Sequence, residues 1–100
     1  MTFTKIENKI LEKIITSNFT KRELKILLLI VRFSYGLDKN YAVVDKKDFF
    51  YAGIFPYHVD EILKQLLIRR VINWNPEKEM FWINRNIKEW IDKNTKLDQY

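Results

Sequence analysis

Apolar residues recur every three to four positions in the first third of the chain, which is the period of an amphipathic α-helix. In the segment NKILEKIIT, this spacing predicts a short helix that is capped by Asn8 and ends near Ser17. Phe3 and Ile6 precede it and would anchor an extended arm over residues 1–7. The apolar positions expected to face the core are Ile10, Leu11, Ile14 and Ile15.

A second, longer helix has the clearest start in the sequence. Thr20 and Glu23 have the spacing of a capping box, in which each side chain accepts a hydrogen bond from the other residue's backbone N–H. The helix would run through RELKILLLIVRFSYG to Gly36, a natural left-handed terminator. Apolar residues occupy two of its faces, which predicts a central place in the domain. They are Leu24, Leu27, Leu28 and Val31 on one face and Ile26, Ile30 and Phe33 on the other.

The next part of the chain combines a short strand with two helices. YAVV predicts an edge strand, after which Asp45 caps a brief helix that Gly53 ends. Pro56 suits the first turn of the following helix, because its missing N–H needs no partner there. Arg69 and Arg70 stand in the last turn of that helix, where cations complement the helix dipole. The residues of this helix that would face inward are Val59, Ile62, Leu63 and Leu66.

Two strands and a last helix complete the predicted order of elements. VINW and MFWIN are typical of strands, and NPEKE between them is typical of a hairpin turn. IKEWIDKN predicts a final helix over residues 87–94, followed by a polar tail over residues 95–100. A helix–turn–helix followed by a two-stranded hairpin is the winged-helix pattern. We therefore predict one α+β, mostly helical domain over residues 1–100, a winged helix-turn-helix with an extra C-terminal helix.

Composition excludes several classes of function. The chain has no Cys and a single His, His58, so a metal site is not expected. It contains no Gly-rich phosphate loop and no convincing Ser–His–acid set, and its carboxylate pairs have structural explanations, so we predict neither an enzyme nor a cofactor. The longest apolar run, Ile26 to Val31, is too short to span a membrane, and the opening MTFTKIENK is no signal peptide. The absence of Cys fits the cytoplasm.

The formal net charge of +5 is concentrated in the first 40 residues, which carry eight Lys and Arg against four Asp and Glu. Residues 41–70 carry five against four, and residues 71–100 carry five against five. The basic excess therefore precedes the helix with which a winged-helix protein enters a DNA groove. A charge of this size permits an acidic partner without requiring one.

Three motifs, FTKIENKIL, LLLIVRFSYG and FWINRNIKEW, occur in the order and spacing of one known family. The residues that carry the likeness are Phe3, Ile6, Asn8, Ile10, Leu11, Arg32, Ser34, Tyr35, Gly36, Asn86 and Trp90. Over residues 3–91 the chain resembles the N-terminal winged-helix domain of the bacteriophage replication protein O family. The resemblance implies a non-catalytic domain that binds repeats in a phage replication origin, in the cytoplasm of the host bacterium. In that family a separate C-terminal region recruits the replicative helicase.

The first functional hypothesis is binding of double-stranded DNA through the helix that begins near Pro56. Tyr57, His58 and Lys64 would face bases in the major groove. Cations at the starts of the preceding helices and on the hairpin turn would contact phosphates. These are Lys21, Arg22, Lys25, Lys46, Lys47 and Lys78.

The same helix departs from the family pattern, which leaves a second hypothesis open. The family has small hydroxyl and basic side chains where this chain has Phe55, Asp60 and Glu61. Carboxylates are repelled by phosphates, although one of them can accept a hydrogen bond from cytosine N4, and both can favour the helix N-terminus. The helix–turn–helix also carries more aromatic residues than a small core needs. These rings either pack against Trp74 and Trp82 or bind a protein partner such as the host replicative helicase or its loader. The residues of that predicted contact are Phe50, Tyr51, Phe55, Asp60, Glu61 and Ile68. A homodimer and a transcriptional repressor stay open as well.

Overall fold

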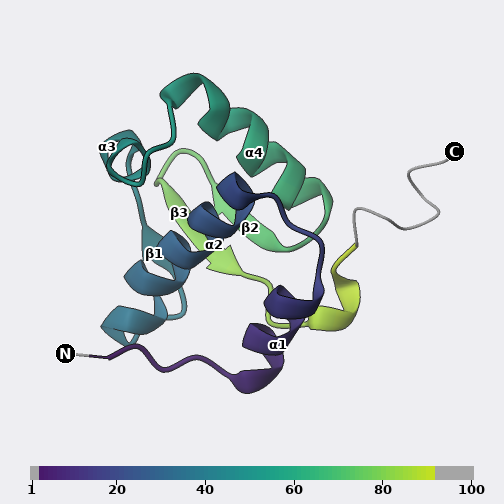
Figure 1. The fold of residues 1–100 in the computed structure, drawn as a ribbon. Coiled ribbons are helices and arrows are strands. Elements are labelled where there is room, and N and C mark those ends of the chain that lie inside the picture. Colours follow the sequence, from purple (N-terminus) through teal and green to yellow (C-terminus); the bar gives the residue numbers. More distant parts are fainter. Residues whose placement is uncertain (1–2, 92–100) are drawn as a thin grey trace, which may run out of the picture.

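The computed structural model describes residues 3–91 and gives the α+β fold that the sequence predicts. Figure 1 shows α2 crossing the middle of the molecule, with α3 and α4 at the top of the view and α1 at the bottom. The elements in chain order are α1 (Asn8–Thr16), α2 (Lys21–Phe33), η1 (Tyr35–Leu37), β1 (Ala42–Val43), α3 (Lys46–Tyr51), α4 (Pro56–Ile68), β2 (Ile72–Asn75), β3 (Met80–Ile83) and η2 (Ile87–Glu89).

The three strands form one antiparallel sheet in the order β1-β3-β2. β2 and β3 are the two arms of a hairpin, and Trp74 on β2 stands opposite Phe81 on β3. The turn between them, residues 76–79, is called the wing below. The short strand β1 pairs with β3 through Ala42 and Phe81. With α2, α3 and α4, this sheet makes the predicted winged helix (Figure 1).

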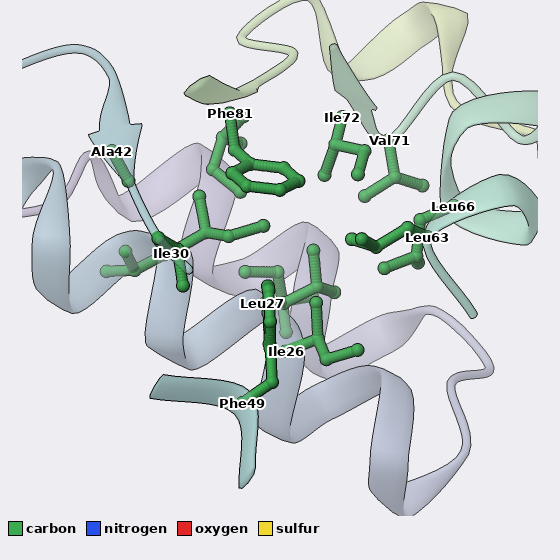
Figure 2. Close-up of a cluster of buried hydrophobic side chains, with 14 of the residues drawn as sticks. Ile26, Leu27, Ile30, Ala42, Phe49, Leu63, Leu66, Val71, Ile72 and Phe81 are labelled. Atoms are coloured by element: carbon green, nitrogen blue, oxygen red, sulfur yellow. The ribbon is translucent and has the colours of Figure 1, made fainter. Parts of the chain in front are cut away.

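The core is built around α2. Ile26, Leu27 and Ile30 are completely buried, and Figure 2 shows their side chains pointing toward those of α4 and the sheet. From α4, Leu63 and Leu66 meet them. Full burial of one such side chain contributes about 1.5–3 kcal/mol. The core therefore fixes which face of α4 remains in water.

Two capping boxes start the helices on either side of the sheet's first strand. In the predicted box, the Glu23 N–H donates to Thr20 Oγ1 at 3.2 Å and the Thr20 N–H donates to Glu23 Oε1 at 2.8 Å. A second capping box forms at α3, where the sequence predicts Asp45 as the cap. Asp45 accepts from the N–H of Lys47 and of Asp48, and Asp48 accepts from the N–H of Asp45. Both helices thus start with satisfied backbone donors.

The end of α2 differs from the prediction. Gly36 does not take the left-handed conformation, which belongs to Asp38 with φ 57°. The helix ends earlier, at Phe33, because the backbone of Ser34 is no longer helical, with φ −106° and ψ −81°. The N–H and the hydroxyl of Ser34 both donate to the Ile30 carbonyl, at 2.9 and 2.6 Å. The chain then tightens into η1.

Helix α1 buries a narrower stripe than expected. Ile10 and Ile14 are buried, and the N-cap is Glu7, without a side-chain hydrogen bond, so Asn8 is the first helical residue and no cap. A helix at the edge of a small domain meets neighbours on one side only, which leaves the next apolar positions in water. The predicted core residues of α1 that are exposed are Leu11 and Ile15, and on α2 the predicted core residue Leu28 is exposed as well.

Of the helix predicted over residues 87–94, the structure shows only the single 3-10 turn η2. The prediction is wrong at Trp90, whose backbone is extended. The Ile91 N–H donates to the Arg69 carbonyl at 2.8 Å, so it cannot make the bond that would continue a helix. The remainder of that helix and the predicted polar tail lie outside the described residues. No helix within residues 3–91 is long and apolar enough to cross a membrane.

The two arginines after α4 do not play the predicted part. The helix ends at Ile68, and Arg69 is buried with its guanidinium 3.6 Å from the Glu23 carboxylate. Arg70 has a left-handed backbone with φ 60°. The left-handed residue lies in the turn that leads from α4 into β2, which starts at Ile72. Arg69 is therefore part of the interior.

Candidate nucleic-acid interface

Helix α4 presents one stripe of side chains to solvent. Its inward residues Val59, Leu63 and Leu66 are buried, and Ile62 is half-buried. The opposite face therefore carries a phenol, two carboxylates, an amine and an aliphatic side chain in succession. These exposed residues are Tyr57, Asp60, Glu61, Lys64 and Ile68.

The carboxylates on this stripe are not explained by the start of the helix. Pro56 is the first residue of α4, and the first turn contains no acidic residue. Asp60 and Glu61 belong to the second turn, where the influence of the helix dipole has already fallen off. The prediction that Asp60 and Glu61 favour the N-terminus of their helix is therefore wrong.

A row of aromatic rings joins α3 to the beginning of α4. The Phe50 and Phe55 centroids are 6.4 Å apart, and Phe55 stacks on Tyr57 at 5.7 Å with an angle of 8°. The His58 ring follows at 4.3 Å from Tyr57. We call Phe50, Phe55, Tyr57 and His58 the ring row. Its first three members are 60, 52 and 73% exposed, so it is a surface feature.

The remaining rings near this face divide between core and solvent. Phe49 is buried and meets Phe81 edge to face at 5.9 Å, while Trp74 stacks on Phe81 at 5.8 Å. Tyr51, by contrast, is 92% exposed. The prediction that some surplus rings remain on the surface is confirmed.

A first cleft lies between α4 and the wing. Lys46 and Lys47 from the start of α3 and Asp60 from α4 stand at this cleft, together with Glu79 of the wing. Its apolar lining includes Trp74. Cations and carboxylates thus line the same cleft. Lys78, on the wing turn, is exposed and is not part of the lining.

A second cleft lies between the start of α2 and α4. The structure brings Lys21 and Arg22 together with His58 and Glu61 in its lining. The predicted cations on α2 and the predicted base-facing histidine are thus neighbours.

Lys25 has a different environment from the one predicted. Its ammonium donates to the Ala52 carbonyl at 3.2 Å, at the end of α3. There it supports the turn that contains Gly53, whose backbone is left-handed with φ 87°. This bond ties the start of α2 to the end of α3, and the phosphate contact expected for Lys25 stays a prediction.

Two ionisable groups, Glu7 and Tyr35, have shifted pKa values. The hydrogen bond from Arg85 lowers the pKa of the Glu7 carboxyl, and burial raises the pKa of the Tyr35 phenol. Within residues 3–91, no three His, Asp or Glu side chains gather in a way that could hold a metal ion.

Comparison with known proteins gives one finding. The family model described as bacteriophage replication protein O matches residues 2–90, which span every helix and strand from α1 to η2. No curated protein and no solved structure matches the chain.

Proposed function

Because the chain belongs to the bacteriophage replication protein O family, whose role lies in phage DNA replication, we propose that its winged helix binds double-stranded DNA at a replication origin. The observation that carries the proposal is the position of α4 between two clefts that both contain cations. Lys46 and Lys47 stand at one, and Lys21 and Arg22 at the other. The domain acts by binding and performs no chemical step.

Base contacts in this proposal come from the exposed side of α4. Lys64 donates to guanine O6 and N7 in the major groove, and His58 offers a ring nitrogen to a base edge. The Tyr57 ring packs against a thymine methyl group, with its hydroxyl free to bond a neighbouring base. These three side chains select the sequence.

Phosphate contacts come from both sides of α4. Two basic pairs separated by one helix can engage the backbones that flank a groove, and Lys78 on the wing can reach a further phosphate. Such contacts fix the orientation of the protein but carry no sequence information. They make affinity fall steeply with salt.

The carboxylates give this interface a particular balance. Asp60 and Glu61 are exposed and face the same groove as Lys64, so they oppose every phosphate that approaches. One of them can be compensated by accepting a hydrogen bond from cytosine N4. Binding to a duplex of random sequence is therefore weak. Specificity for the origin repeat comes mostly from the repulsion of other sequences, which leave both carboxylates without a hydrogen-bond donor.

Titration of labelled duplexes tests the proposal. An origin repeat of the phage and a shuffled duplex of the same composition are compared at two salt concentrations. We expect the repeat to bind more tightly and the double variant Tyr57→Ala, Lys64→Ala to lose the preference. Leu28→Ala, an exposed apolar residue of α2 outside both clefts, is the matched control. Sequence preference retained by the double variant contradicts the assigned base contacts.

A second candidate function is binding of a host replication protein, the replicative helicase or its loader. The observation in its favour is that Asp60 and Glu61 are exposed beyond the first turn, in the same stripe as the 66% exposed Ile68. Together with Phe50, Tyr51 and Phe55 they offer anchors and charge to a basic, apolar partner surface. Pull-down with purified helicase and loader, beside origin duplex, decides between the two. If only the duplex is retained, this candidate is abandoned.

A further inference from the structure

The outward face of α3 combines cations with rings. Lys46, Lys47, Phe50 and Tyr51 are all exposed, and a separation of four residues places Lys46 beside Phe50 and Lys47 beside Tyr51. The acidic residues of this segment are engaged elsewhere, because Asp45 and Asp48 form the capping box with the backbone. The free face of this helix is therefore basic and aromatic.

This face continues along the ring row. From Phe50 the row passes through Phe55 and Tyr57 to His58, with successive centroids 6.4, 5.7 and 4.3 Å apart. His58 lies in the second cleft, which Lys21 and Arg22 also line. A continuous path of rings thus has two cations at each end.

Double-stranded DNA does not match such a path. In a duplex the faces of the bases are covered by stacking, and only their edges are presented in the grooves. Unpaired bases expose their faces, and exposed protein rings are the platforms on which they stack, whatever the sequence. The cations at the two ends would contact the backbone of the same strand.

We propose that the face formed by Lys46, Lys47, Tyr51 and the ring row binds single-stranded DNA. This goes beyond recognition of an origin duplex, because an unpaired strand appears only after the duplex has opened. A protein partner fits this face less well, since the neighbours of the rings on α3 are lysines. The carboxylates Asp60 and Glu61 stand beside the α4 part of the face, and each shares its cleft with two cations. The domain would thus hold one strand of a melted origin.

Fluorescence anisotropy with a labelled deoxythymidine oligonucleotide tests the role of the rings. The double variant Phe50→Ala, Tyr51→Ala should weaken binding by about tenfold for each ring lost from a stacked base. The variant Phe50→Tyr, Tyr51→Phe keeps both rings and should bind as the unchanged protein does. Ile15→Ala, Leu28→Ala removes two exposed apolar side chains elsewhere and is the matched control. A loss no larger than that of the control pair overturns the proposal.

The salt dependence tests the role of the cations. If Lys46 and Lys47 each neutralise one phosphate, the variant Lys46→Gln, Lys47→Gln should reduce the slope of log affinity against log salt by about 1.4 for a single strand. An unchanged slope would remove the two lysines from the proposed path.

Photocrosslinking locates the strand. A single strand that carries 5-iodouracil reacts on irradiation with rings stacked against it, and we expect adducts at Phe50, Tyr51, Phe55 or Tyr57. Adducts confined to the wing or to the far end of α4 would overturn the proposal. An RNA strand of the same sequence is measured in parallel, and tighter binding of the RNA would overturn the assignment to DNA.

The proposed duplex recognition and the inferred single-strand binding can be overturned independently. Loss of single-strand binding in the Phe50→Ala, Tyr51→Ala variant with the origin duplex still bound supports both proposals. Failure of the unchanged protein to bind the oligonucleotide, while it binds the duplex, overturns only the inference. Binding of the oligonucleotide without any preference for origin repeats overturns only the proposed duplex recognition. A third outcome overturns the inference and assigns the rings to a protein partner. In that outcome the unchanged protein captures the purified helicase but does not bind the oligonucleotide, and the Phe50→Ala, Tyr51→Ala variant no longer captures the helicase.

Discussion

The guanidinium of Arg69 lies 3.6 Å from the carboxylate of Glu23, and both side chains are almost completely buried. Arg69 also lies over the Phe19 ring, 4.5 Å from its centroid, and its Nε donates to the Ile91 carbonyl at 2.9 Å. A further bond reaches the Asn18 carbonyl at 3.3 Å. One charged side chain therefore connects the end of α4 with the start of α2, the segment before it and the last part of the described chain.

Replacing Arg69 should destabilise the fold strongly. Arg69→Met leaves the Glu23 carboxylate buried opposite an apolar side chain, which costs about 3–5 kcal/mol of the free energy of unfolding. Urea denaturation followed by circular dichroism measures this change. Arg70→Met, at an exposed neighbouring arginine, should stay within about 0.5 kcal/mol.

The companion variant identifies the mechanism. In Glu23→Gln, Arg69→Met the charge is removed while the amide oxygen can still accept from the Thr20 N–H, which preserves the cap. This double variant should recover a large part of the lost stability. If it is no more stable than Arg69→Met alone, the loss comes from packing and the buried charge is not its cause.

The turn of the helix–turn–helix depends on Gly53. Its backbone has φ 87°, a conformation that costs residues with a Cβ about 1–2 kcal/mol. Among the described residues, an added Cβ would come close only to Lys25 Nζ, at an ordinary contact distance of 3.6 Å. Gly53→Ala should therefore be destabilised through the backbone, and thermal unfolding measures the effect. Gly53→Asn, which tolerates the left-handed region better, should lose less. Equal losses in the two variants would point to a steric cause.

The ion pair between Glu7 and Arg85 predicts a pH dependence of stability. Arg85 Nε donates to the Glu7 carboxylate at 2.7 Å and lowers its pKa below the ordinary 4.5. A carboxyl with a lowered pKa in the folded state contributes stability above its unfolded pKa and loses it as the pH falls through the folded value.

The melting temperature tests this sign. The advantage of the unchanged protein over Arg85→Gln should be small but present at pH 7, because the pair is exposed, and should vanish as the pH falls well below 4.5. Lys88→Gln, on η2, serves as the control for loss of an exposed cation. An advantage that grows on acidification would show that the pair does not lower the pKa of Glu7.

The two carboxylates of α4 should govern the affinity for arbitrary DNA. Asp60→Asn, Glu61→Gln removes two negative charges from the face that meets phosphates, and each is worth about 1 kcal/mol at close range in water. We expect tighter binding of a shuffled duplex and a smaller preference for the origin repeat, measured by anisotropy at low salt. If a host replication protein is the true partner, the same variant should instead lose that protein and leave DNA affinity unchanged.

The sequence by itself determined the elements whose causes are local. The Thr20–Glu23 box, Pro56 at the start of α4 and Gly53 at the bend are signals carried by neighbouring residues, and each is confirmed. The winged-helix order followed from the periods of the apolar positions, since a helix and a strand bury different repeats. The sequence also predicted more rings than the core could use.

Only the tertiary structure decided the features that depend on neighbours distant in the chain. The local pattern predicted that Arg69 lies in the last turn of α4 and complements the helix dipole. In the structure Arg69 pairs with Glu23, which is 46 positions away in the chain, and no spacing rule links these two residues. The same holds for the end of the predicted last helix, where Ile91 bonds to Arg69, and for Lys25, which supports the turn after α3. The ring row joins two helices across a turn, so its continuity became visible only when both were placed. Periodicity shows which residues can be buried, whereas the fold decides which of them meet.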